Sequence, residues 1–194
     1  YTMERYFVLE DTMEITDKIA QDVMKNVMKY AKILKKDPEN YEARAEIMWC
    51  GSLSHNGLTG CGTCGGDWAT HLIEHELGGM FDVAHGAGLA AVWGSWARYV
   101  MDEKPERFAQ FAVDVMGVEE SDDVKSTALK GIEAVEEFYR MIEMPTNMKE
   151  LGIDPTDEQI KDMAMKATNH DTQQLGAFKK LSAKDLVEIY KTAK

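Results

Sequence analysis

The chain has 194 residues, which is room for one large domain or two small ones, and it carries 34 acidic against 22 basic side chains. The resulting net charge of −12 argues against a nucleic-acid binder, which needs a clustered basic face. A hydrophobic content of 44% excludes a disordered chain, yet no stretch approaches the roughly 20 apolar residues of a membrane span. Three cysteines without a signal-like segment indicate a reducing compartment, so we expect a cytoplasmic protein.

Apolar residues recur at three- and four-residue spacing along most of the chain, which predicts amphipathic helices. The first two helices are expected at residues 12–35, with a capping box formed by Asp11 and Glu14, and at residues 41–55, ending at Asn56-Gly57. A glycine-rich loop then covers residues 57–66. The chain starts at Tyr1 rather than at a methionine, so we expect a piece of a longer polypeptide.

Further helices are expected in the rest of the chain. They are predicted at residues 68–77, broken by Gly78-Gly79, and at 86–101, 105–116 and 122–141, with two more that begin at capping boxes of Thr156 with Gln159 and Ser182 with Asp185. Residues 169–180 have no clear assignment, and no βαβ rhythm is present. The sequence therefore predicts an all-α, multi-helix domain over residues 1–194 with at least seven helices.

Three histidines within a short stretch are the first candidates for chemistry. His71 and His75 lie four residues apart, so both imidazoles project from one helix face, a workable spacing for metal ligands. On a straight helix His85 would lie roughly 21 Å from His71, too far to share an ion. The glycines at 78–79 and 86–88 would allow the chain to fold back and bring His85 opposite. The spacing indicates a metal pocket but does not say which two or three histidines bind.

Two other hypotheses compete with this one. The segment from His71 to His75 matches H-x-x-E-H, which is typical of a zinc hydrolase with Glu74 as the general base. A non-catalytic helical interaction domain, in which the histidines are structural, is the other. Trp68, Trp93 and Trp96 suit either an apolar substrate pocket or ordinary core packing.

A C-x-x-C pair, Cys61 and Cys64, lies in the glycine-rich loop. A zinc site there would need two more ligands, and Cys50 and His55 are the only near candidates. A thioredoxin-like role would need a βαβ context that the sequence lacks. A tight glycine loop with incidental cysteines is the favoured interpretation.

Several motifs together match one known family. They are Asn56-Gly57-Leu58 with the glycine loop, Asp67-Trp68-Ala69-Thr70-His71, His75-Glu76-Leu77, His85-Gly86, the opening Met3-Glu4-Arg5-Tyr6-Phe7 and the stretch 181–190. The chain resembles the C-terminal half of iron-containing (group III) alcohol dehydrogenases, in the branch of butanol dehydrogenases and aldehyde reductases. The resemblance runs from end to end of the chain.

The resemblance implies a helical domain that holds one divalent metal, iron or zinc. In it His71 and His85 would be metal ligands, and His75 would serve as a catalytic proton relay in contact with the nicotinamide cofactor. The family's ligand aspartate would precede residue 1, and its other ligand histidine aligns with Tyr1. NAD(P)H would be bound mainly by an N-terminal α/β domain that this chain lacks, so the chain alone is expected to be inactive. The expected function is interconversion of small primary alcohols and aldehydes by a homodimer, with no nucleic-acid or membrane partner.

Overall fold

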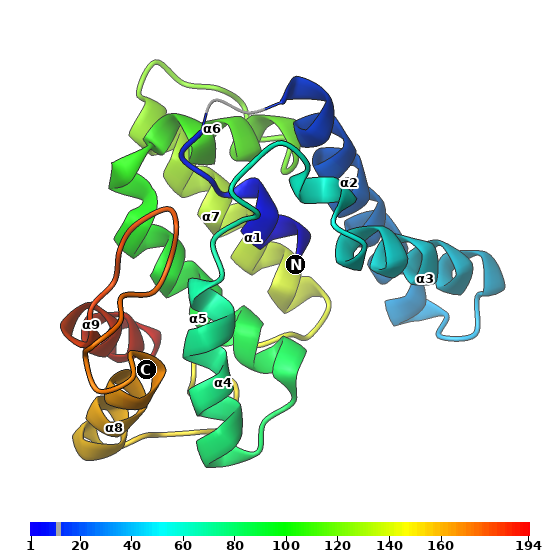
Figure 1. Ribbon diagram of the computed structural model, residues 1–194. Coiled ribbons are helices and arrows are strands. Elements are labelled where there is room, and N and C mark those ends of the chain that lie inside the picture. The colour runs from blue at the N-terminus through cyan, green and yellow to red at the C-terminus, as the bar shows by residue number, and fades with distance from the viewer. Residues whose placement is uncertain (11–12) are drawn as a thin grey trace. The chain divides into compact units, whose positions relative to one another are not determined.

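The computed structural model describes residues 1–10 and 13–194 and confirms the all-α class (Figure 1). Within these ranges the chain forms nine α-helices and two short 3-10 helices, and extended pairing is limited to one bridge between Leu175 and Leu181. The chain divides into two compact units, one made of Tyr1–Asp67 and Lys104–Ala134 and the other of Trp68–Glu103 and Val135–Lys194. None of the described helices is both long and apolar enough to cross a lipid bilayer.

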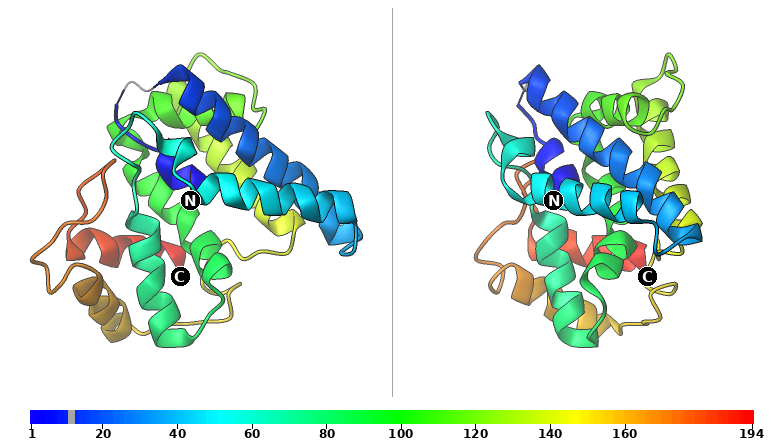
Figure 2. Two further views of the ribbon diagram at one scale, coloured as in Figure 1. Left: turned by 45° about the vertical axis from the view of Figure 1, so that its right-hand side comes forward. Right: turned by 90° about the vertical axis from the view of Figure 1, so that its right-hand side faces the viewer.

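The first unit is built around a helical hairpin and an aromatic core. Its elements are α1 (Thr2–Tyr6), α2 (Glu14–Lys36), α3 (Tyr41–His55), η1 (Leu58–Gly60), α6 (Pro105–Asp114) and the first part of α7 (Val124–Met141). Helices α2 and α3 pack against each other and run antiparallel (Figures 1 and 2). The Phe7 ring stacks on Phe108 with centroids 4.4 Å apart and meets Phe111 at 5.1 Å, so burial of these rings fixes α1 beside α6.

Local signals set the helix ends in this unit. The Asn40 side chain caps α3 by accepting from the Ala43 amide at 3.0 Å, and Pro105 occupies the first turn of α6. As predicted, α3 stops at the Asn56-Gly57 pair: His55 is its last residue, Asn56 is the C-cap, and Gly57 follows with a φ of +89°. Helix α2 begins at Glu14, and the predicted capping residue Asp11 lies outside the described residues.

The glycine-rich loop packs against α1. The Asp67 amide donates to the carbonyl oxygen of Glu4 at 2.8 Å, and the Arg5 guanidinium donates to the carbonyl oxygen of Ser54 at 2.7 Å. Cys61 and Cys64 are exposed free thiols, whereas Cys50 is buried. These contacts support the interpretation of a tight structural loop with incidental cysteines.

The second unit holds the three histidines. Its elements are α4 (Ala69–Phe81), α5 (His85–Val100), η2 (Met101–Glu103), the second part of α7, α8 (Asp157–Ala167) and α9 (Ala183–Ala193). Helix α5 packs against α4 and α9, and α8 packs against the same two helices. Their shared core contains Ile73, Leu77, Trp96, Ile160 and Tyr190, none more than 1% exposed. Both predicted capping boxes, at Thr156 and Ser182, are present.

The predicted break at Gly78-Gly79 is wrong. Helix α4 continues through both glycines to Phe81 and ends at Asp82, which takes the left-handed conformation with a φ of +53°. A glycine inside a helix costs only about 1 kcal/mol relative to alanine. Burial of Ile73 and Leu77 on the inner face of α4 outweighs that cost, so the helix persists.

Candidate metal centre

Helices α4 and α5 bring the three histidines together. His71 and His75 lie one turn apart on α4, and His85 is the first residue of α5, after the short turn at Asp82. The ring centroid of His85 lies 5.1 Å from that of His71 and 5.7 Å from that of His75, and the two α4 rings are 6.0 Å apart. The chain thus folds back as the histidine pattern requires, at Asp82 instead of at the glycine pair.

The three imidazoles differ in their exposure. His71 is buried at 6% exposure, with the Trp68 ring 5.5 Å from it, centroid to centroid. His75 is exposed, and the His85 side chain is half exposed. The cluster therefore reaches from the interior of the unit to its surface.

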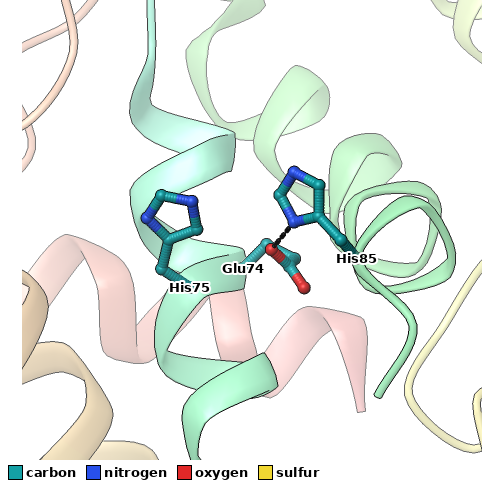
Figure 3. Close-up of side chains that lie close together, drawn as sticks. All are labelled: Glu74, His75 and His85. Atoms are coloured by element: carbon teal, nitrogen blue, oxygen red, sulfur yellow. Dashed lines mark hydrogen bonds and ion pairs between the residues drawn. The ribbon is translucent and has the colours of Figure 1, made fainter. Parts of the chain in front are cut away.

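Glu74 is the fourth member of the cluster. It is buried at 1% exposure, and its Oε2 atom accepts a hydrogen bond from Nδ1 of His85 (Figure 3). Since a carboxylate only accepts, Nδ1 of His85 carries the proton and Nε2 is the nitrogen with a lone pair for a metal ion. Glu74, His75 and His85 each offer a ligand atom, and these atoms lie within 4.8 Å of one another.

Two glycines make room for this carboxylate. A Cβ placed on Gly88 of α5 would lie 2.6 Å from Oε1 and 2.7 Å from Cγ of Glu74. A Cβ on Gly78 of α4 would lie 3.2 Å from the same oxygen. Sequence reasoning considered Glu74 only as the general base of a hydrolase and did not foresee its contact with His85.

The zinc-hydrolase hypothesis receives little support from this geometry. A general base must reach a water molecule at the metal, whereas Glu74 is buried and already hydrogen-bonded to a histidine outside the H-x-x-E-H motif.

Trp93 and Trp96 are 4% and 1% exposed, which fits core packing of α5 and not a substrate pocket. Within the described part of the chain, the group of candidate metal ligands contains no cysteine.

Tyr1, which the resemblance aligns with a ligand histidine, lies in the first unit. Its ring centroid is 3.9 Å from that of His55. A tyrosine offers a phenol oxygen where a histidine offers an imidazole nitrogen, and a phenol is the weaker ligand toward iron(II) or zinc unless it is deprotonated.

Comparison with known proteins decides the family. The model of the Fe-containing alcohol dehydrogenase family, C-terminal, matches residues 1–194. The chain belongs to this family. NADH-dependent butanol dehydrogenase A of Clostridium acetobutylicum is 31% identical over 192 residues, which are 98% of this chain and 49% of that protein. The NADPH-dependent aldehyde reductase YqhD of Escherichia coli is 30% identical over 195 residues, which cover 100% of this chain and 49% of that protein. The chain thus spans about half the length of these relatives.

Solved structures of the Fe-containing alcohol dehydrogenase family agree with the fold. NADH-dependent butanol dehydrogenase A from Thermotoga maritima matches with a TM-score of 0.90 and 34% identity, over 99% of this chain and 49% of that one. The structure of E. coli YqhD matches with a TM-score of 0.91 and 28% identity, over 100% of this chain and 48% of that one.

Membership of the Fe-containing alcohol dehydrogenase family implies a divalent metal, and the residues present fit one. Imidazole and carboxylate are ligands that iron(II) and zinc both accept. Three such side chains offer atoms within 4.8 Å of one another, and the fourth, His71, has its ring 5.1 Å from that of His85.

Proposed function

We propose that this chain is the helical, metal-holding half of an NAD(P)H-dependent dehydrogenase that interconverts primary alcohols and aldehydes. The observation that carries the proposal is the convergence of His71, His75 and His85 from α4 and α5. Relatives whose names state butanol dehydrogenase and aldehyde reductase activities support the substrate class. A nicotinamide nucleotide would be bound mainly by the other half of the full-length enzyme.

His71 and His85 are the proposed metal ligands. Their rings are the nearest pair in the cluster, at 5.1 Å, and they come from different helices, so an ion held by both would tie α4 to α5. A bound divalent ion supplies a Lewis acid for the oxygen of the alcohol or aldehyde. The alternative set of Glu74, His75 and His85 shares only His85 with this assignment.

His75 is the proposed proton relay. It is exposed, so its ring can exchange protons with solvent, and its ring centroid lies 5.7 Å from that of His85. An ordinary imidazole titrates near neutrality, which suits a group that takes a proton from the alcohol in one direction and returns it in the other. The buried His71 is less suited to this exchange, because solvent barely reaches it.

Metal replacement in the full-length protein tests the proposal. We expect purified protein to contain about one divalent ion per chain and to oxidise NADH or NADPH when butanal is added. Chelation should remove both the ion and the turnover, and iron(II) or zinc should restore both. Full turnover in protein shown by elemental analysis to be free of metal would contradict the proposal. His170→Asn, a change at an exposed histidine outside the cluster, serves as the control and should keep wild-type metal content.

A further inference from the structure

The contact between Glu74 and His85 joins a buried carboxylate to a candidate metal ligand. The carboxylate lies between α4 and α5, and its Oε2 atom faces Nδ1 of His85 (Figure 3). Because Nδ1 is then the protonated nitrogen, the other nitrogen of the ring, Nε2, presents its lone pair on the far side from Glu74. Metal-bound histidines commonly donate their second N–H to a carboxylate in this way, which fixes both the tautomer and the direction of the ring.

We propose that Glu74 is a positioning residue that holds His85 in the Nδ1–H tautomer, so that Nε2 is ready to bind the metal. The inference rests on the proposed function, since it concerns the same metal site. Glu74 acts through His85 and does not itself ligate the ion. The His85 side chain is half exposed. Without the hydrogen bond to Glu74 it would populate both tautomers and several rotamers.

The fold provides a fitted place for this carboxylate. Oε1 of Glu74 would be 2.6 Å from a Cβ at Gly88 and 3.2 Å from a Cβ at Gly78, so neither α5 nor the next turn of α4 places a side chain beside it. Both glycines lie inside helices, where glycine is less favourable than alanine. The space beside the carboxylate is thus kept free of side chains on both helices, and within that space Oε2 faces Nδ1 of His85.

As a carboxylate, Glu74 would also act through the ring on an ion held by His85. A buried carboxylate hydrogen-bonded to Nδ1 raises the basicity of Nε2, and loss of such a partner typically costs 10–100-fold in metal affinity. A glutamine at position 74 keeps an oxygen that can accept from Nδ1–H but removes the charge. The glutamine variant should therefore lie between wild type and alanine, if the role is positioning.

The first arm of the test measures metal affinity in full-length protein with zinc and a competing chelator. We expect the dissociation constant to rise roughly 10–100-fold in Glu74→Ala and by less in Glu74→Gln. Equal affinity in wild type and Glu74→Ala would overturn the inference. A loss in Glu74→Gln as large as in Glu74→Ala would also overturn it, because the hydrogen-bond acceptor that glutamine keeps would then contribute nothing to positioning His85.

The second arm uses metal-free protein and nitrogen-15 NMR of the His85 ring. We expect the Nδ1–H tautomer in wild type and a shift toward the Nε2–H tautomer in Glu74→Ala. The Nε2–H tautomer in wild type would overturn the inference. Since no metal is present, this arm separates the two claims: wild-type protein that binds no zinc but shows the Nδ1–H tautomer would refute the proposed function and leave the hydrogen bond standing.

A third arm covers the case in which Glu74→Ala does not fold. Gly88→Ala places a methyl group against the Glu74 carboxylate, whereas Gly86→Ala makes the same change two residues earlier on α5, where no atom lies within 4 Å. We expect Gly88→Ala to weaken zinc binding and to shift the His85 tautomer, and Gly86→Ala to do neither. Equal behaviour of the two variants would overturn the inference.

Discussion

Gly66 and Glu4 lie so close together that a Cβ on Gly66 would stand 2.7 Å from the carbonyl oxygen of Glu4. Gly66 also has a φ of +111°, and the amide of the next residue, Asp67, donates to the same carbonyl oxygen at 2.8 Å. The glycine-rich loop is thus closed onto α1 by a contact that tolerates no side chain. This contact gives Gly66 a structural reason that needs no bound phosphate or metal.

Replacing Gly66 by alanine should therefore destabilise the protein strongly. The positive φ costs an alanine about 1–2 kcal/mol, and the clash with the α1 backbone adds to that cost. Gly65→Ala is the matched control, because Gly65 has a φ of +94° but no atom within 4 Å of its Cβ position. Urea denaturation should show a clearly larger loss for Gly66→Ala; equal losses would show that the contact with α1 is unimportant.

The three histidines should separate by role in full-length protein. His71→Ala and His85→Ala each remove a proposed ligand, so bound metal and turnover should fall together. His75→Ala should keep most of the metal while turnover drops by roughly 10²–10⁴-fold, as for a lost proton-transfer group. Elemental analysis combined with NAD(P)H oxidation measures both quantities.

The rival assignments predict other patterns for the same variants. If His71 and His75 were the ligand pair of a hydrolase, these two would behave alike and His85 would be dispensable. If Glu74, His75 and His85 were the ligands, His71→Ala would keep its metal. Loss of metal in His75→Ala with retention in His85→Ala would contradict the proposed roles.

Arg107 should be the most sensitive ionic position of the first unit. It is 4% exposed, forms a two-pronged pair with Asp17 at 2.5 and 2.7 Å, and donates to the carbonyl oxygen of Tyr6 at 2.7 and 2.9 Å. Arg107→Met would leave Asp17 buried without its cation, and breaking a buried pair in this way costs about 3–5 kcal/mol.

The control for Arg107 is the exposed pair between Glu14 and Lys18 on α2. Glu14→Gln should leave the free energy of unfolding unchanged within error, since water and salt screen an exposed pair. Urea denaturation of both variants measures the difference. An Arg107→Met protein as stable as Glu14→Gln would show that the buried pair contributes no net stability.

Stability should decline at alkaline pH. Burial raises the pKa of Tyr6 to about 12, although the nearby Arg107 cation partly opposes the shift. Burial also raises the pKa of Tyr190, with Glu76 and Glu74 adding to the effect. Unfolded tyrosine ionises near pH 10, so between pH 10 and 12 the unfolded state holds fewer protons than the folded state.

The free energy of unfolding should consequently be unaffected by these groups below about pH 10 and fall above it, by up to about 1.4 kcal/mol per pH unit for each tyrosine. Urea denaturation at pH 9, 10 and 11 tests this expectation. Tyr6→Phe removes one ionising group and should flatten the decline. An identical slope in wild type and Tyr6→Phe would mean that Tyr6 ionises equally in both states.

Helical periodicity predicted most elements because their buried faces repeat over several turns, as in α2 and α7. It missed α1, whose five residues are too few to show a period. It also put the end of α4 at a glycine pair, whereas the left-handed residue is Asp82, of a type that adopts this conformation less readily than glycine. Gly78 stays helical because tertiary packing supports α4 at this point. The local sequence carries no sign of that packing.

The sequence predicts only part of the histidine cluster, because residue spacing fixes positions within one helix but not between two helices. A four-residue spacing fixes His71 and His75 on one face of any helix, so their proximity follows from the sequence. The position of His85 depends on the angle at which the chain leaves Asp82, and the contact of His85 with Glu74 depends on that angle as well. Spacing carries no information about that angle, so neither the Glu74 contact nor the space left by Gly88 could be derived from it.

The turn at Asp82 also bears on the order in which the protein folds. His71 and His85 are only 14 residues apart in the sequence, so bringing them together closes a short loop at little entropic cost. The second unit as a whole must join Trp68–Glu103 to Val135–Lys194 across an intervening segment, which is a longer closure. Helices α4 and α5 can therefore pair early in folding and bring the imidazoles together. A metal ion bound at that stage would stabilise the native pairing of these helices before residues 135–194 have packed against them.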